Sequence, residues 1–273
     1  MTVRFHALAM LLGVALVACD SKSDKAVLDM SEESPVTYHQ EEDPEIAEAS
    51  LNARNSFKHF WKEASLDFNR IVPALELACV KVPFSDDPSD LSSQVEHMWV
   101  TEIDYDGETI KGVLMNSPNW LQSVHEGDSV KVIVDELSDW MCVLGGKVYG
   151  AYTVQATRKR MDDAERKEFD AAWGLAFPAP EEVLLPPNPS PFEPVLARQL
   201  EVELGRNPEL ITQKYDDGRS LLHLDALYGR SQSVAVLLQA GADTFAKCDR
   251  GWTPADYAKA AGWDEIVTQL TKN

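Results

Sequence analysis

Positive charge is scarce in this chain of 273 residues, where 25 lysines and arginines face 45 aspartates and glutamates and the formal net charge is −20. So acidic a surface repels the phosphates of nucleic acids and of anionic lipids. We therefore expect neither as a partner. The hydrophobic fraction of 44% is ordinary for a globular protein, and the length allows two modest cores.

Cysteine is also scarce, with four in the chain. Apart from Cys19, the cysteines are Cys79, Cys142 and Cys248, which show no CxxC spacing and no neighbouring histidine pair. The sequence therefore predicts no metal site, and it indicates no cofactor. A Cys79–Cys142 disulfide is allowed in an oxidising compartment, and buried free thiols are the alternative.

The apolar run at the N-terminus is too short to span a bilayer. It covers residues 7–18 after the positive charge of Arg4, and it predicts a cleaved export signal over residues 1–18. The run ends in Leu16-Val17-Ala18-Cys19, which resembles the lipobox of bacterial lipoproteins. The resemblance implies acylation of Cys19 and anchoring in the cell envelope. In enteric bacteria the following Asp20 is typical of retention on the periplasmic face of the inner membrane. A plain signal peptide is the alternative.

Catalytic motifs are missing as well, with no glycine-rich phosphate loop, serine elbow or paired metal ligands. Only His97, His125, Asp139 and Cys142 could carry chemistry, as a His97–Asp139 dyad with Cys142 as the nucleophile. An aspartate at a strand start commonly fixes a turn, and a histidine on an alternating strand commonly packs across it. The sequence favours these structural roles, so we assign no catalytic residue and no small-molecule substrate.

What the chain does contain is a helical pattern followed by strand patterns. Apolar residues recur at helical spacing over 44–67 and predict a helix. Short alternating or apolar runs then predict five or six antiparallel strands, at 75–82, 95–105, 109–115, 130–137, 140–144 and 148–155. A charged helix at 161–173 closes an α+β domain over 44–176, a β-meander with flanking helices that could curl toward a small barrel. Residues 19–43, rich in Ser, Asp and Glu, predict an acidic flexible tether.

Proline is concentrated in one segment, since seven of the 15 prolines fall within residues 177–194. Proline does not fit inside a helix or a central strand. The segment therefore predicts a semi-rigid spacer between two separate domains.

A period of 33 residues marks the last segment, 195–273. The phrase Gly218-Arg-Ser-Leu-Leu-His223 returns as Gly251-Trp-Thr-Pro-Ala-Asp256. This period resembles the ankyrin repeat, which implies an all-α stack of about two and a half helical hairpins that binds proteins. The positions that carry the resemblance are Gly218, His223, Gly229, Gly241, Gly251, Thr253, Pro254 and Gly262.

The same resemblance implies roles for individual residues. Thr253 caps a helix with Pro254 in its first turn, and His223 forms hydrogen bonds within and between the turns. Asp225 stands where the repeat has a small buried alanine, so we expect it to be exposed at an edge or paired. The expected hairpin tips supply the candidate partner-binding residues Arg219, Phe245, Lys247, Asp249, Arg250 and Trp252. Packing of Trp252 on Phe245 or Trp263 is the alternative to an interface role.

The middle domain has a resemblance of its own. It is carried by the segments 81–83, 97–100, 112–116, 138–141 and 146–150, in that order. They resemble the bacterial YegJ-like domain of unknown function, which is also found joined to ankyrin repeats. This implies a fold but no reaction. We therefore expect an envelope lipoprotein that binds an unknown protein. The alternatives are an immunity or protective protein, which blocks a toxin or supports an envelope enzyme, and an envelope hydrolase using the His97/Asp139 region.

Overall fold

The computed structural model describes residues 43–87, 89 and 94–272. The expected signal peptide, Cys19 and the expected tether up to residue 42 lie outside the described residues. We call residues 43–177 the sheet body, 178–192 the strap and 193–272 the repeat arm.

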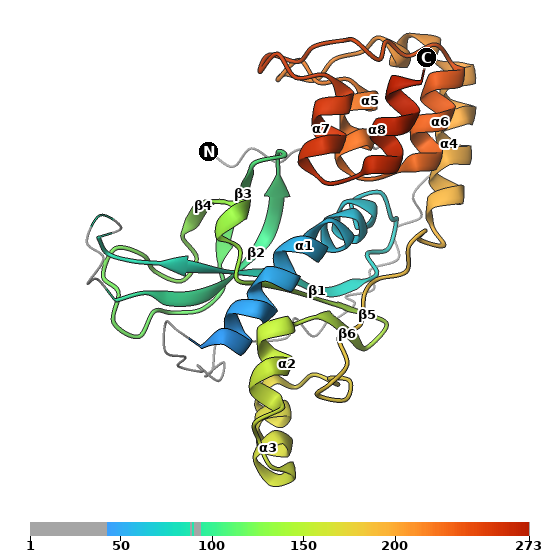
Figure 1. Cartoon of the computed structure of the whole chain (residues 1–273). Helices are drawn as coiled ribbons and strands as arrows, with labels where there is room; N and C mark the ends of the chain where they lie inside the picture. Colours follow the sequence, from blue (N-terminus) through green and yellow to red (C-terminus); the bar gives the residue numbers. More distant parts are fainter. Residues whose placement is uncertain (1–42, 88, 90–93, 273) are drawn as a thin grey trace, which may run out of the picture.

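The sheet body is built on one antiparallel sheet with the strand order β4-β3-β2-β1-β5-β6. Helix α1 lies across one face, and α2 and α3 close a second core on the other (Figure 1). The helices are α1 (Pro44–Asp67), α2 (Tyr152–Arg158) and α3 (Asp163–Trp173). The strands are β1 (Leu75–Phe84), β2 (Glu96–Tyr105), β3 (Thr109–Leu114), β4 (Ser129–Ile133), β5 (Asp139–Leu144) and β6 (Lys147–Gly150). The helix predicted over 44–67 and the mixed helix and sheet character are confirmed.

Two expectations for this sheet are wrong. The strands form neither a simple meander nor a barrel, because the chain passes from β4 at one edge, through the short helix η1 (Val134–Glu136), to β5 beside β1. Burial explains the central place of β1, since Cys79, Val80 and Val82 are fully buried and β1 faces both cores. The strand expected over 148–155 ends at Gly150, where Ala151 takes a left-handed conformation and α2 begins.

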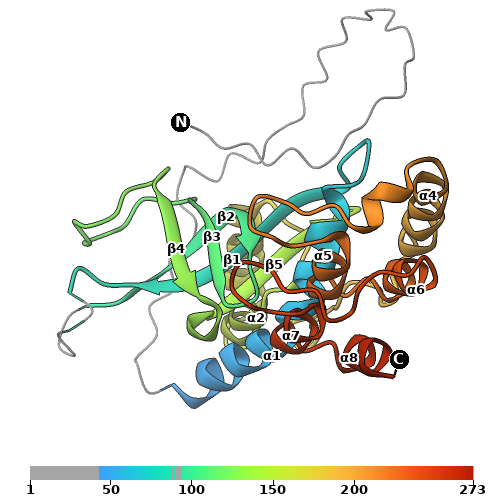
Figure 2. The same cartoon turned by 90° about the horizontal axis from the view of Figure 1, so that it is seen from above.

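The repeat arm consists of two stacked helix pairs preceded by a longer helix. Its helices are α4 (Glu193–Arg206), η2 (Pro208–Ile211), α5 (Leu221–Leu227), α6 (Ser231–Gln239), α7 (Pro254–Ala260) and α8 (Asp264–Thr271). Helices α7 and α8 begin 33 residues after α5 and α6, which is the period seen in the sequence. Figure 2 shows α5 and α7 next to α1, with α4, α6 and α8 in an outer row.

The strap differs from the expected spacer between separate domains. It lies along the sheet body, where the amide of Gly150 donates to the carbonyl of Leu184 at 2.9 Å and the Gln155 side chain donates to the carbonyl of Glu182 at 2.6 Å. Lys62 donates to the Asn188 side chain at 3.0 Å. Prolines remove backbone donors but keep their carbonyl acceptors, and the Arg158 guanidinium satisfies one of them by donating to the carbonyl of Pro178 at 2.8 Å.

The repeat arm rests directly on α1 and shares a core with the sheet body. Leu227, Cys248 and Tyr257 of the arm belong to the same buried cluster as Phe57 and Trp61 of α1. The described residues therefore form one structural unit with a shared core, rather than two separate domains joined by a spacer.

Candidate interaction surface

Two of the expected partner-binding residues, Arg250 and Trp252, are used inside the chain. Arg250 donates to the carbonyl of Asp106 and to the Glu108 carboxylate, both at 3.0 Å. The Trp252 ring lies against Gly107, where an added Cβ would come within 3.0 Å of it. These contacts attach the arm to the turn between β2 and β3. The outer side of Trp252 lines an open hollow with Asp256, Lys259 and Ala260.

Arg219 is also engaged within the arm. Its guanidinium pairs with Asp217 at 2.6 Å and lies 5.9 Å from the centre of the Tyr257 ring. Only 14% of its side chain is exposed. Arg219, Arg250 and Trp252 therefore each make contacts within the chain, and the partner-binding role expected for them stays a prediction.

The other candidates, Phe245, Lys247 and Asp249, lie on the second finger (residues 245–253), a loop that runs beside the first finger (212–220). Lys214 of the first finger donates to the carbonyl of Lys247 at 3.1 Å, and the amide of Asp249 donates to the carbonyl of Asp217 at 3.0 Å. These bonds hold the fingers as one surface.

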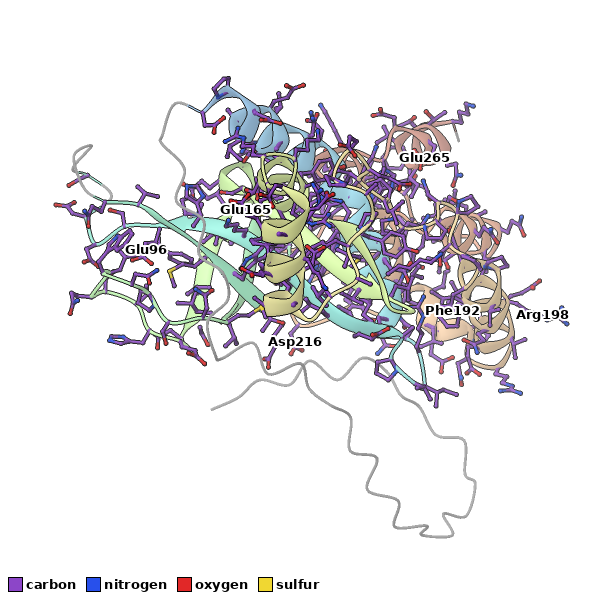
Figure 3. The ribbon with its side chains drawn as sticks, turned by 90° about the horizontal axis from the view of Figure 1, so that it is seen from below. Glu96, Glu165, Phe192, Arg198, Asp216 and Glu265 are labelled. Carbon is purple, nitrogen blue, oxygen red and sulfur yellow. The ribbon has the colours of Figure 1, made fainter. Side chains whose placement is uncertain are left out.

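We call five of the solvent-exposed residues of this surface the finger edge, namely Tyr215, Asp216, Phe245, Lys247 and Asp249. Phe245 is 75% exposed and Tyr215 is 40% exposed. Asp216, labelled in Figure 3, lies in the first finger, whereas Arg198 and Glu265 lie on the outer helices α4 and α8. Tyr215 was missed by sequence reasoning, although an aromatic residue three positions before the repeat glycine Gly218 was a usable signal.

His223 connects the first helix pair to the second finger. Its Nδ1 accepts from the backbone amide of Ser220 at 3.0 Å, and its Nε2 lies 3.2 Å from the carbonyl oxygen of Trp252. Burial lowers the pKa of His223, which keeps the ring neutral near pH 7. In the second pair Thr253 and Asp256 cap one another reciprocally, with Pro254 following in the first turn.

The residues considered for hydrolysis are not arranged as a nucleophile and its base. The Asp139 carboxylate accepts from the amides of Trp140, Tyr152 and Thr153, so it fixes the start of α2. Burial raises the pKa of Asp139. His97 Nδ1 lies 2.6 Å from the Ser138 hydroxyl oxygen.

Cys142 lies in the core under α1, on the other face of the sheet from Met141 and Cys79. Because neighbouring residues of a strand point to opposite faces, Cys142 and Asp139 do not share a face. The same alternation separates Cys79 from Cys142, and both are buried free thiols, so the disulfide considered from the sequence is not formed. Burial raises the pKa of both thiols, which disfavours the thiolate. His125 is exposed and lies 3.6 Å from Asp128.

Buried ion pairs line the contact between the arm and α1. Lys62 pairs with Glu193 at 2.8 Å, and these side chains are 5% and 0% exposed. Asp225 is likewise buried and pairs with Arg230 at 3.2 Å, so of the two expectations for Asp225 the paired one holds. Arg230 also donates to the carbonyl of Ser65 in α1 at 2.6 Å.

Within residues 43–87, 89 and 94–272, no cluster of three acidic, histidine or cysteine side chains is placed to bind a metal ion. In the same part of the chain, no helix has the length and apolar character needed to cross a bilayer.

Comparison with known proteins gives matches for both parts of the chain. Residues 43–177 match the family described as "Uncharacterized protein conserved in bacteria (DUF2314)". A protein of Neisseria meningitidis serogroup B, named "Putative ankyrin repeat protein NMB1133/NMB1171", is 37% identical over 250 residues, which cover 88% of this chain and 98% of that protein. The uncharacterized protein YegJ of Escherichia coli K12 is 35% identical over 75 residues, or 28% of this chain and 46% of YegJ.

Proposed function

The chain belongs to the bacterial family that includes the meningococcal ankyrin-repeat relative and carries the DUF2314 domain, and on this basis we propose that it binds another protein. From the lipobox-like Leu16-Val17-Ala18-Cys19 we further propose that it is an envelope lipoprotein. The name of the relative supports protein binding in general terms. The proposal assigns no reaction to the sheet body.

The exposed ring of Phe245 is the observation that carries the proposal. It stands on the finger edge, and its loop is fixed because the Asp243 carboxylate accepts from the Phe245 amide at 2.9 Å. Aromatic residues, phenylalanine among them, are enriched in protein interfaces relative to the rest of the surface. The other aromatic residue of the second finger, Trp252, packs within the chain against Gly107 and Tyr257. Phe245 is therefore the aromatic residue of this finger that we propose contacts the partner.

The direction of α1 supports an anchored arrangement. Arg160 binds Asp43 and Glu45 at the N-terminal end of α1, whereas the repeat arm contacts α1 from Lys58 to Ser65. The helix has 24 residues and is therefore about 36 Å long. A lipid on Cys19 would attach to the part of the chain that leads into this end of α1, and the repeat arm lies at the opposite end of the helix (Figure 1).

Binding through the finger edge is tested by Phe245→Ala, with Phe68→Ala as the matched control. Phe68 is an exposed phenylalanine, 55% accessible, on the sheet body. A partner is first cross-linked in cells and identified, and its affinity is then measured by titration. We expect Phe245→Ala to weaken binding about tenfold or more and Phe68→Ala to leave it unchanged. Equal affinities for both variants would remove the finger edge as the binding surface.

The proposed attachment to the cell envelope is tested separately with the variant Cys19→Ala. The wild type should incorporate labelled palmitate and sediment with membranes, and the variant should do neither. Unchanged membrane association of the variant would contradict lipidation at Cys19.

A second candidate is an immunity or protective protein that neutralises a basic toxin, which the net charge of −20 favours. Its partner affinity should fall steeply between about 50 mM and about 500 mM salt, because screening weakens charge pairing. Binding that is indifferent to salt would favour the apolar finger edge alone.

A further inference from the structure

The sheet body has an edge strand on each side, and the two edges are treated differently by the fold. The strap reaches the edge formed by β6, where the Gly150 amide donates to the carbonyl of Leu184. The other edge is β4, and among residues 43–87, 89 and 94–272 no strand lies beyond it (Figure 2). An uncovered edge strand presents unpaired N–H and C=O groups to which another chain can bind.

The hydrogen bonds at the two ends of β4 show which of its backbone groups are open. The Leu114 amide donates to the carbonyl of Asp128 at 3.0 Å. At the other end, the Val134 amide donates to the carbonyl of Glu108 at 3.0 Å. In an antiparallel pair, every second residue bonds to the neighbouring strand and the residues between them point their backbone groups away from it. The residues of β4 whose N–H and C=O groups face the open edge are Ser129, Lys131 and Ile133.

Two lysines lie side by side at this edge, in a chain whose formal net charge is −20. Lys111 of β3 and Lys131 of β4 are directly opposite each other, in a pair of the closer, non-bonded kind. Both are exposed, and in the part of the chain that the structure describes neither takes part in an ion pair. Asp104 of β2 lies opposite Lys111 on its other side. A row of one carboxylate and two ammonium groups therefore crosses three strands, and its last positive charge, at the open edge, has no negative neighbour in the row.

The two faces of β4 differ in character. Val132 and its neighbour on β3, Ile110, are buried in the core under α1. Alternation along the strand places Lys131 and Ile133 on the opposite face, where no residue of β4 belongs to the core formed with α2 and α3. Ile133 is 55% exposed. A strand added beside β4 would therefore bring side chains of one face next to Val130 and Val132, and a side chain of the other face next to Lys131.

We propose that β4 is a docking edge for an extended segment of another protein, which adds to the sheet as a further strand and sets an aspartate or glutamate opposite Lys131. Backbone hydrogen bonds to the open edge supply affinity, and the carboxylate opposite the lysine supplies selectivity. The acidic residues Asp135 and Glu136 follow β4 directly. A single acidic residue between valines, isoleucines or threonines therefore fits the edge better than an acidic run.

A second copy of this chain suits the edge less well than such a segment. In a register centred on Lys131, the copy would bring the same lysine opposite it, next to the repulsive pair that Lys131 already forms with Lys111. The inference rests neither on the finger edge nor on a lipid at Cys19, so its failure would leave both of those proposals standing.

Titration of the full-length protein with two blocked peptides of about nine residues, the length of a long strand, tests the proposal. Both peptides alternate threonine and valine, and the central residue is glutamate in one and lysine in the other. We expect the glutamate peptide to bind the wild type about fivefold more tightly than the lysine peptide, and Lys131→Glu to reverse this preference. Lys147→Glu, at an exposed lysine of the other edge strand, is the matched control and should keep the preference of the wild type.

Amide hydrogen exchange locates the bound peptide. Saturation with the glutamate peptide should slow exchange at Ser129, Lys131 and Ile133 by about tenfold or more. Exchange at Val130 and Val132, which already bond to β3, should not change.

Equal affinities for the two peptides, a preference that Lys131→Glu leaves intact, or unchanged exchange at the three open amides would each overturn the proposal. Protection of these amides that grows with protein concentration when no peptide is present would assign the edge to a second copy, and would overturn it as well.

Discussion

Gly229 shows how one residue fixes the packing of the repeat arm. Its φ is +71°, a conformation that side chains disfavour, and a Cβ at this position would overlap the Trp263 ring. The second helix pair can approach the first this closely only because residue 229 has no side chain. The glycine period noticed in the sequence therefore has a steric cause here.

Gly229→Ala should destabilise the protein by about 3 kcal/mol, because strain in the backbone adds to overpacking against Trp263. Gly241→Ala is the matched control. Its φ is +87°, but nothing lies within 4 Å of the added Cβ, so only the backbone strain of about 1 kcal/mol should appear. Urea denaturation of the two variants gives the comparison. Equal losses of stability in the two variants would show that contact with Trp263 is not the reason why residue 229 must be glycine.

The second finger carries two aromatic residues with different surroundings. Trp252 packs on the β2–β3 turn and on Tyr257, at 5.1 Å between ring centres, whereas Phe245 stands in solvent. The two aromatic residues are seven positions apart, but substituting Trp252 should lower the stability of the protein far more than substituting Phe245.

Trp252→Ala should lower the free energy of unfolding by about 2–4 kcal/mol, because a partly buried aromatic ring is lost from the shared core. Phe245→Ala should change it by less than about 0.5 kcal/mol, because an exposed ring contributes little to folding. Thermal and urea unfolding of both variants would test this difference. A destabilised Phe245→Ala would mean that the ring packs within the chain.

At the scale of elements, the sequence predicted the helices and strands whose apolar residues recur at a regular spacing. Helix α1 and the strands from β1 to β5 follow apolar patterns seen in the sequence, although the strand predicted over 130–137 ends at Ile133, where η1 begins. Helix α2 was missed because residues 148–155 are apolar enough for a strand, and its start depends on Asp139, a residue 13 positions before Tyr152. The place of the strap was missed for a similar reason, since its partners Gln155 and Lys62 come from distant segments.

The candidate surface was predicted in part. The repeat pattern located the fingers, but it could not tell which tips face solvent, because Arg250 and Trp252 meet a turn more than 140 residues earlier in the chain. The pairing of Asp225 could be anticipated from the cost of burying a charge, although its connection to Ser65 could not.

At the scale of the whole molecule, the shared core implies cooperative unfolding. Leu227 and Tyr257 of the repeat arm pack in one cluster with Phe57, Trp61 and Tyr105 of the sheet body. Calorimetry of the chain should therefore show a single transition whose calorimetric and van't Hoff enthalpies agree. Two separated transitions would indicate that the arm and the body fold independently. The variant Leu227→Ala, which removes a fully buried side chain from the contact, should lower that single transition rather than split it.

The central claim is that the arm uses Trp252 to attach to its own sheet body and Phe245 to meet a partner. Its most direct test places a photo-cross-linking amino acid at position 245 or at position 252 of the full-length chain and irradiates living cells. We predict that position 245 forms adducts with another protein and that position 252 forms cross-links within the chain, to the β2–β3 turn around Gly107. Intermolecular adducts from position 252, with none from position 245, would contradict the account.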